Sequence, residues 1–247
     1  MPPQLEPDDD LHRAQQALLS DIAARVVAAH APGLPSPRRV REPLDALIET
    51  ILNQQNTRSV TERQYAALRA AFPTWTDALH AGSDVIEDTL RAAGGGLARV
   101  KADYIWNVLH AIAERGPLTL QGLYALTDDE ARSTLEALPG VGMKTASAVL
   151  LFDMLRPAMP VDTNILRVTR RLALLPLKWS THRVERWYDG VLPRTWRDRY
   201  AFHVGMIRHG RHTCTPKRPA CPTCVLADLC PSAPVFLGSD SLNAGER

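Results

Sequence analysis

The chain has 247 residues, which is enough for one large domain or two compact ones. It contains no apolar run of about eighteen residues or more, and its start (MPPQLEPDDD) carries acid where a signal peptide carries base and then an apolar stretch. These features argue against a membrane-spanning or exported protein, so we expect a cytoplasmic, nucleoid-associated one.

The net charge of +2 is distributed unevenly along the chain. Residues 1–50 hold five Lys or Arg against eight Asp or Glu, whereas residues 161–231 hold thirteen against five. Such a basic segment is typical of a surface that binds a polyanion, although a solvated basic face without a partner would show the same asymmetry.

The first elements in the chain are a tail, a helix and a linker. Residues 1–10 are rich in Pro and Asp and predict a disordered tail. Apolar residues at helical spacing then predict a helix over Leu11–His30, with Asp10 as its N-cap. The Pro-rich segment 31–39 breaks this helix and predicts a linker.

A succession of further helical segments predicts an all-α fold. No alternating strand pattern of useful length occurs, and Gly94-Gly95-Gly96 predicts a loop whose backbone bends freely or approaches something closely. The predicted helices are Pro43–Leu52, one after a Ser59–Glu62 capping box, Asp103–Ile112, and one from a Thr127–Glu130 capping box to Leu138.

A glycine-containing turn, LPGVGMKTA over Leu138–Ala146, separates two amphipathic segments. Glycines at alternate positions let successive backbone N–H groups point the same way, next to the positive end of the following helix. Gly140, Val141, Gly142 and Thr145 therefore form a candidate phosphate site. Many helix–helix turns contain glycine for steric reasons alone, so this motif by itself does not establish a phosphate site.

A second motif strengthens the functional interpretation: Asp162 lies eighteen residues after Lys144, in the segment PVDTNILRV. With the hairpin, this segment resembles the endonuclease III branch of the helix-hairpin-helix DNA glycosylase superfamily. The resemblance implies that Lys144 attacks the sugar and forms a Schiff base, while Asp162 supports departure of the base and Thr163 caps a helix beside them. The alternative is an exposed hairpin lysine and a helix-capping aspartate, each common on its own.

The chemistry suits these residue types. An amine is a nucleophile only in its neutral form, and a carboxylate near the sugar stabilises the positive charge that develops as the glycosidic bond breaks.

The four cysteines lie within seventeen residues, at Cys214, Cys221, Cys224 and Cys230, in a chain where disulfides are not expected. Four thiolates so close in sequence can hold one zinc ion or an iron–sulfur cluster. The C-x6-C-x2-C-x5-C spacing has only one short knuckle, and it resembles the [4Fe-4S] motif of the same family. In that family the cluster loop presents basic residues to DNA phosphates, which points to Lys217 and Arg218; a solvated basic loop is the alternative.

Further correspondences follow from the resemblance. Gln55, in LNQQNT, matches the residue that enters the space left by an extruded nucleotide. Leu97, in GLARVKA, matches an apolar wedge opposite the lesion, or it is an ordinary core residue at a helix start. Glu136 matches an acidic position near the pocket; alternatively it is a solvated residue at a helix end. Met143 and Asn164 depart from the Arg and His that many relatives carry, which puts lesion preference in doubt.

The resemblance implies two helical lobes with a DNA-binding groove between them and the active site at their junction. Residues 41–156 are expected to form a helical barrel with the hairpin, residues 11–40 and 157–231 the cluster lobe, and residues 232–247 a flexible tail. The expected protein is a monomeric glycosylase and abasic-site lyase that removes oxidised pyrimidines from double-stranded DNA.

Two alternatives stay open. One is a monofunctional enzyme of the mismatch adenine glycosylase type, which usually lacks the hairpin lysine and carries a further C-terminal domain; this chain has Lys144 and ends seventeen residues after Cys230. The other is a catalytically silent protein that binds damaged DNA.

Overall fold

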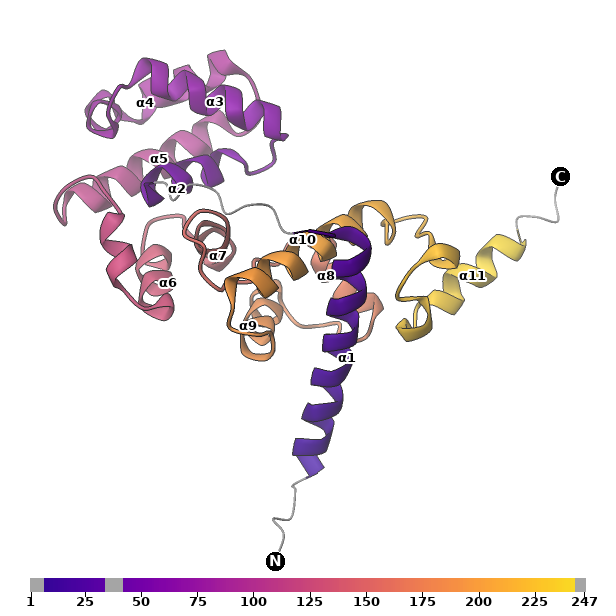
Figure 1. The fold of residues 1–247 in the computed structure, drawn as a ribbon. Helices are drawn as coiled ribbons and strands as arrows, with labels where there is room; N and C mark the ends of the chain where they lie inside the picture. Colours follow the sequence, from indigo (N-terminus) through magenta and orange to yellow (C-terminus); the bar gives the residue numbers. More distant parts are fainter. Residues whose placement is uncertain (1–6, 34–41, 243–247) are drawn as a thin grey trace, which may run out of the picture. The chain divides into compact units, whose positions relative to one another are not determined.

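The computed structural model describes residues 7–33 and 42–242, and within these ranges it contains helices and no strands. The predicted all-α fold is confirmed for this part of the chain (Figure 1). The chain divides into two compact units, one formed by Met1–Ser36 with Pro157–Arg247 and the other by Pro37–Arg156. No described helix is long and apolar enough to cross a membrane. Residues 1–6 of the expected tail and 34–39 of the expected linker lie outside the described residues.

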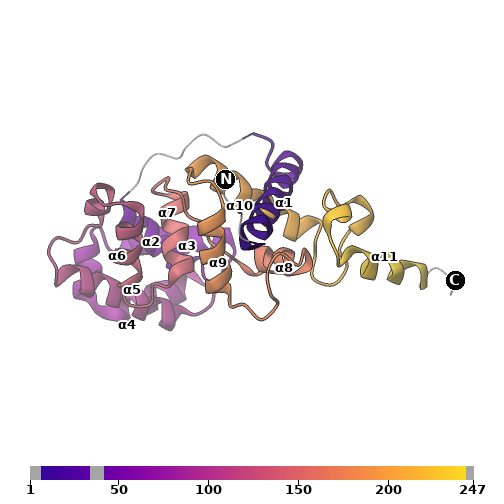
Figure 2. The ribbon, with the colours of Figure 1, turned by 90° about the horizontal axis from the view of Figure 1, so that it is seen from below.

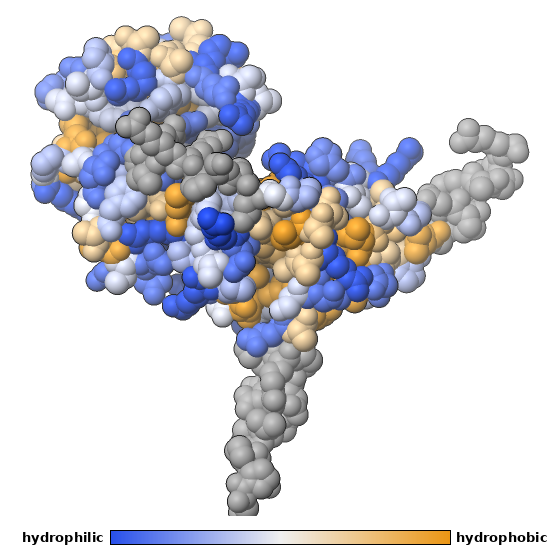
Figure 3. Space-filling model, in the orientation of Figure 1, coloured by the Kyte–Doolittle hydropathy of each residue, from blue (hydrophilic) through white to orange (hydrophobic). Residues whose placement is uncertain are grey.

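The unit Pro37–Arg156 is a helical bundle with a continuous apolar core. Its core includes the fully buried side chains of Leu47, Ile86 and Ile105, and the surface over α3 and α4 in Figure 3 is mostly hydrophilic, as expected of helices that bury one face. Its elements are α2 (Pro43–Leu52), α3 (Arg58–Ala71), α4 (Trp75–Ala93), α5 (Ala98–Ala113), a 3-10 turn (Gln121–Ala125), α6 (Asp128–Glu136) and α7 (Met143–Phe152).

The caps of these helices test the predicted boundaries. The Thr127–Glu130 capping box is confirmed, because each side chain accepts from the other residue's backbone N–H. The Ser59–Glu62 box is wrong: Thr57 caps α3 by accepting from the N–H of Val60, so the helix begins at Arg58. Helix α5 begins at Ala98 rather than Asp103, and the fully buried Lys101 explains why its polar sequence concealed the first turn.

The second unit combines the N-terminal helix α1 with helices from the C-terminal part of the chain. Helix α1 packs along α10, as both Figure 1 and Figure 2 show. A Cβ at Gly205 would lie 2.8 Å from Val26 Cγ1, so only glycine permits this approach. The elements are α1 (Pro7–His30), α8 (Thr163–Arg171), α9 (Thr181–Val191), α10 (Trp196–His212), two 3-10 turns (Cys221–Thr223 and Ala227–Leu229) and α11 (Ala233–Leu242).

Three predictions at the ends of this unit are wrong. The disordered tail predicted over residues 1–10 is wrong for residues 7–10, which belong to α1. Helix α1 begins at Pro7, so Asp10 lies inside it and does not cap it; proline at the first position and acid in the first turn both favour a helix start. Residues 233–242 form α11, although a flexible tail was expected over 232–247. The Arg171 guanidinium lies 4.6 Å from the centre of the Phe236 ring, a tertiary contact that no local pattern signals.

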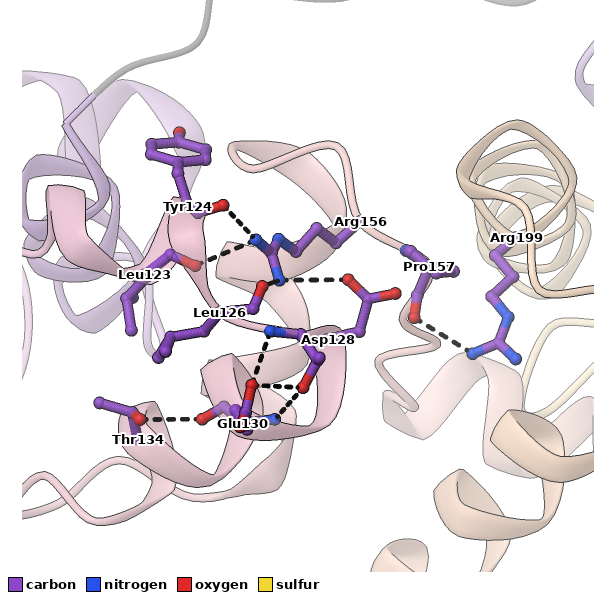
Figure 4. Close-up of polar contacts among 10 residues, drawn as sticks. Leu123, Tyr124, Leu126, Asp128, Glu130, Thr134, Arg156, Pro157 and Arg199 are labelled. Atoms are coloured by element: carbon purple, nitrogen blue, oxygen red, sulfur yellow. Dashed lines mark hydrogen bonds and ion pairs between the residues drawn. The ribbon is translucent and has the colours of Figure 1, made fainter.

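Arg156 binds several backbone carbonyls at the end of the 3-10 turn Gln121–Ala125. Its guanidinium donates to the carbonyls of Leu123, Tyr124 and Leu126 at 2.8–3.1 Å, and to Asp128 at 3.2 Å (Figure 4). The 3-10 turn and the start of α6 are therefore fixed to the end of α7.

Arg199 performs a similar task in the second unit, where its side chain is only 3% exposed. It donates to the carbonyls of Pro157, Asp189, Leu192 and Pro193, and forms a 2.6 Å ion pair with the Asp189 carboxylate. The contact with Pro157, drawn in Figure 4, fixes the first residue of the segment that leads to α8.

Replacing this buried cation should be costly. Arg199→Met removes one partner of a mostly buried ion pair and leaves several carbonyls without a donor, so we expect a loss of about 3 kcal/mol in the free energy of unfolding. Urea unfolding followed by circular dichroism measures it. Arg58→Met is the control, because its ion pair with Glu62 is 79% and 56% exposed and should contribute little to stability. Equal stability of the two variants would contradict the argument.

Candidate active site and cluster site

The hairpin predicted from LPGVGMKTA joins α6 to α7. Gly142 is the N-cap of α7 and has no side chain to accept from the first N–H groups of the helix. Val141 is buried and anchors the turn, while Gly140 and Gly142 are exposed. Backbone N–H groups at an uncapped, exposed helix start are suited to binding an anion.

Gly140 is the position where the turn requires glycine. Its φ of 74° lies in the left-handed region, and a Cβ there would come within 2.6 Å of the Tyr104 ring. Tyr104 belongs to α5, so the hairpin lies against this helix through a glycine contact.

This contact gives a matched pair of substitutions. Gly140→Ala meets both a strained φ and the Tyr104 ring, so it should lower the free energy of unfolding by about 1–3 kcal/mol. Gly142→Ala, at φ −89° with nothing within 4 Å of the added Cβ, should cost less than about 1 kcal/mol. Thermal unfolding of both variants provides the comparison, and an undisturbed Gly140→Ala would count against the close approach.

Lys144 is the second residue of α7 and its side chain is exposed. Thr145 follows it and is partly buried. Glu136, the last residue of α6, keeps one carboxylate oxygen buried with no hydrogen-bond partner among the described residues. The unit Pro37–Arg156 thus carries an accessible amine directly after the uncapped glycine turn.

Asp162 lies in the other unit, where it is the N-cap of α8. Its Oδ1 accepts from the backbone N–H groups of Asn164 and Ile165, both at 2.8 Å, and its Oδ2 accepts from the Asn164 amide at 2.8 Å. The expected capping role of Thr163 is wrong, because Asp162 itself performs it and Thr163 is the first helical residue. The carboxylate is held in one orientation, partly exposed.

A chain of contacts leads from Asp162 to the cysteine loop. Arg167 donates to Asn164 Oδ1 at 3.0 Å, to the Gly210 carbonyl at 2.7 Å and to the Cys214 carbonyl at 2.9 Å. A Cβ at Gly210 would lie 2.8 Å from Asn164 Cβ, so α10 approaches the start of α8 closely. Asn164, expected in the pocket, is therefore a link between the candidate carboxylate and the first cysteine.

The four cysteines line one cavity, together with apolar side chains and Arg171. No three His, Cys, Asp or Glu side chains in the described part of the chain converge on a single ion. The Leu226 N–H lies 3.4 Å from Cys224 Sγ, and N–H donors of this kind stabilise anionic thiolates. The residues present therefore fit a four-thiolate iron–sulfur cluster.

Arg171 is the cation of this site. Its guanidinium lies 3.2 Å from Cys214 Sγ and donates to the carbonyls of Thr215 and Pro216 at 2.7 and 2.8 Å. The ring of Phe236 covers its other side. Arg171 thus holds the cysteine loop and compensates thiolate charge at the same time.

His209 lies at the wall of the same cavity, 2% exposed. Burial lowers the pKa of His209 to about 4, so the neutral ring has one N–H. Its Nε2 lies 3.8 Å from Cys224 Sγ, and its Nδ1 lies 3.0 Å from His30 Nε2. Because a thiolate only accepts, donation to Cys224 requires that Nδ1 accept the N–H of His30.

The remaining residues predicted to contact DNA are exposed. Gln55 and Leu97 are exposed, Leu97 at 40%, so the reading of Leu97 as a core residue is wrong. Lys217 and Arg218 are exposed in the loop between the first two cysteines, where Thr215 Oγ donates to the Arg218 carbonyl at 2.5 Å.

Sequence reasoning missed the residues that hold these groups in place, namely Arg167, Arg171, His209 and His30. Arginine in a basic helix and histidine near a cysteine motif have no distinctive spacing. The only available signal was the separation of Arg167 and Arg171, which places both on one face of α8.

Two family models match the chain. The model of the HhH-GPD superfamily of base excision DNA repair proteins matches residues 48–193, and that of the iron–sulfur binding domain of endonuclease III matches residues 214–230. Endonuclease III of Escherichia coli (strain K12) is 31% identical over 188 residues, which are 76% of this chain and 83% of that protein. A protein of Arabidopsis thaliana is 40% identical over 134 residues, 54% of this chain but only 45% of the plant protein.

Solved structures show the same likeness. A trapped covalent intermediate of endonuclease III with DNA superposes with a TM-score of 0.72 and 25% identity, covering 90% of this chain and 98% of the other. A thermostable thymine-DNA glycosylase gives the same TM-score at 18% identity, covering 90% and 99%, which supports the fold alone.

The chain therefore belongs to the HhH-GPD superfamily of base excision DNA repair proteins, whose model matches more than half of it. Its cysteine motif and its likeness to endonuclease III over most of that protein's length make it an endonuclease III-like DNA glycosylase with a [4Fe-4S] cluster. The zinc alternative is thereby set aside.

Removal of the Arg171 guanidinium should loosen the cluster. Arg171→Met loses the contacts with Cys214 Sγ and the two loop carbonyls, so we expect the cluster's affinity to fall about 10–100-fold. The rate at which a chelator removes iron from the purified protein, followed by its visible absorbance, measures this change. Arg170→Met is the control, since Arg170 is exposed and binds only the Trp179 carbonyl, at 3.3 Å. Identical iron loss from both variants would rule out the role given to Arg171.

Proposed function

We propose that this protein is a bifunctional DNA glycosylase and abasic-site lyase that removes oxidised pyrimidines from double-stranded DNA and acts as a monomer. The observation that carries the proposal is the position of Lys144, an exposed amine in the first turn of α7 immediately after the anion-binding hairpin. A phosphate held by the hairpin N–H groups brings the adjoining sugar within reach of this amine.

The proposed reaction begins with attack of the neutral Nζ of Lys144 on the sugar C1′. The bond from C1′ to the base breaks, and the base leaves with the bonding electrons and takes up a proton. Opening of the sugar ring gives a Schiff base between Nζ and C1′. Loss of a proton from C2′ then expels the 3′ phosphate, and water hydrolyses the imine to release an unsaturated aldehyde and restore the lysine.

Asp162 supports the departure of the base in this scheme. Its carboxylate stabilises the positive charge that develops on the sugar as the glycosidic bond breaks. The cap of α8 holds the carboxylate in one orientation with three hydrogen bonds, which removes the need to reorganise it during the reaction.

Binding of the duplex precedes this chemistry. The hairpin, Lys217 and Arg218 contact phosphates and position the duplex without reading its sequence. The damaged nucleotide rotates out of the stack, and Gln55 and Leu97 fill the gap. The cluster orders the loop that carries the two basic residues, as an organiser of the binding surface.

The trapped endonuclease III–DNA complex supports the covalent step, since its fold covers 90% of this chain. The test is borohydride trapping on a duplex with one oxidised pyrimidine or one abasic site. The wild-type protein should form a covalent adduct and cut the strand, and Lys144→Gln should form no adduct, because the amide cannot make a Schiff base.

Two further variants separate the roles. Asp162→Asn should slow base release about 100-fold or more on the oxidised pyrimidine while an abasic duplex is still trapped. Lys217→Gln, the charge-matched control for Lys144→Gln, should weaken binding yet form the adduct at saturating protein. Base release without any adduct would show a monofunctional enzyme of the mismatch adenine type, and tight binding without either would show a silent damage-binding protein.

A further inference from the structure

The two residues proposed to fill the gap share an unusual backbone. Gln55 has a φ of 53° and Leu97 a φ of 61°, both in the left-handed region that residues with a Cβ seldom adopt. Both side chains are exposed. Such conformations persist only where the surrounding structure holds them, and they concentrate at functional sites.

A partly buried hydrogen-bond network joins the two segments that carry these residues. The Asn56 amide donates to Gln64 Oε1 and to the Leu52 carbonyl, both at 2.8 Å, while Asn56 Oδ1 accepts from the Gly96 N–H at 3.4 Å. Gln64 is fully buried on α3, and its Nε2 donates to the Gly94 carbonyl at 2.8 Å. Asn56 directly follows Gln55, and Gly96 directly precedes Leu97.

The contact between the two segments is also sterically tight. At Gly95, with a φ of 107°, an added Cβ would lie 2.6 Å from Val60 Cγ1, 2.9 Å from Gln64 Nε2 and 3.2 Å from Asn56 Oδ1. Only glycine fits, so the loop from Gly94 to Leu97 lies directly on the two amide side chains. The Gln55 segment and the Leu97 loop therefore form one packed body within the unit Pro37–Arg156.

We propose that Asn56 and Gln64 are positioning residues that couple Gln55 to Leu97. Both side chains are then held in the inserting conformation before DNA binds, and they enter the duplex together. The proposal rests on the proposed function, because it assigns these residues to the extrusion of a nucleotide. Neither amide touches DNA in this scheme. Their contribution is to hold two strained backbones in the inserting geometry before DNA binds, which removes an ordering cost from the extrusion step.

The experiment compares Asn56→Ala, Leu97→Ala and the double variant in the full-length protein carrying its cluster. The probe is a duplex with 2-aminopurine opposite an abasic-site analogue, whose fluorescence rises when the base opposite the gap is unstacked. Asn56→Ala leaves Gln64 Oε1 and the Gly96 N–H without their partner, so the fluorescence rise should shrink as it does in Leu97→Ala. The double variant should lose no more than Leu97→Ala alone, because Asn56 acts through Leu97.

Schiff-base trapping supplies the second measurement. With an abasic site in duplex DNA, Asn56→Ala should form the adduct about tenfold more slowly. With an abasic site in single-stranded DNA, where no stack must be opened, the rate should stay within about twofold of wild type. Thr61→Val is the matched control: it breaks the hydrogen bond of a buried α3 side chain to Asn53 Oδ1 but leaves the contacts with Gly94 and Gly96 intact, so it should behave as wild type.

The outcomes separate the two proposals. If wild-type protein raises the fluorescence and Asn56→Ala does not, but no adduct forms on any DNA, the lyase step fails and the coupling stands. Equal losses on duplex and single-stranded DNA, additive losses in the double variant, or no fluorescence rise with wild-type protein would each overturn the coupling. Circular dichroism shows whether Asn56→Ala has unfolded. If it has, Gln64→Glu takes its place in both measurements with the same expected results. This variant keeps the acceptor for the Asn56 amide but loses the donor to the Gly94 carbonyl.

Discussion

The Asp162 carboxylate accepts the first free N–H groups of α8, and this cap decides where the helix begins. The start of a helix sets the direction of every later side chain on it. From this start, Arg167 and Arg171 are four residues apart and share the face that meets the cysteine loop. One local interaction therefore orients the candidate carboxylate and the two cations that hold the cluster loop.

Arginine has a recurring role in this fold, because an all-helical chain leaves its connections without regular backbone partners. Arg156, Arg167, Arg171 and Arg199 each bind at least one carbonyl in the connections between helices, namely those of Leu126, Cys214, Thr215 and Pro193, and a planar guanidinium can serve several acceptors at once. The lengths of irregular chain around the sites are thus fixed by hydrogen bonds. Part of the excess of Lys and Arg in residues 161–231 therefore stabilises the fold. The interpretation of this segment as a polyanion-binding surface does not account for these arginines.

The parts of the site that are local in sequence could be predicted. The hairpin, the V-D-T segment and the four cysteines each occupy a few consecutive residues, so their spacing is visible. Asn56, Gln64 and Arg171 could not be found in this way, because most of their partners lie 8 to 45 residues away and are backbone atoms that carry no sequence signal. The first turn of α5 and helix α11 were missed for a related reason: the burial of Lys101 and the cation–π contact of Phe236 are tertiary features without a local sequence signal.

The two readings of Asp162, helix cap and reacting carboxylate, are compatible. A cap must point an accepting oxygen at the helix start, and the proposed reaction requires a carboxylate of fixed direction. The Asn164 amide bound to Oδ2 adds a neutral donor that restrains the carboxylate without neutralising it. A cationic side chain at this position would form an ion pair and withdraw negative charge from the sugar. Asparagine at position 164 is therefore compatible with the electrostatic role proposed for Asp162, and it links this residue, through Arg167, to the cluster loop.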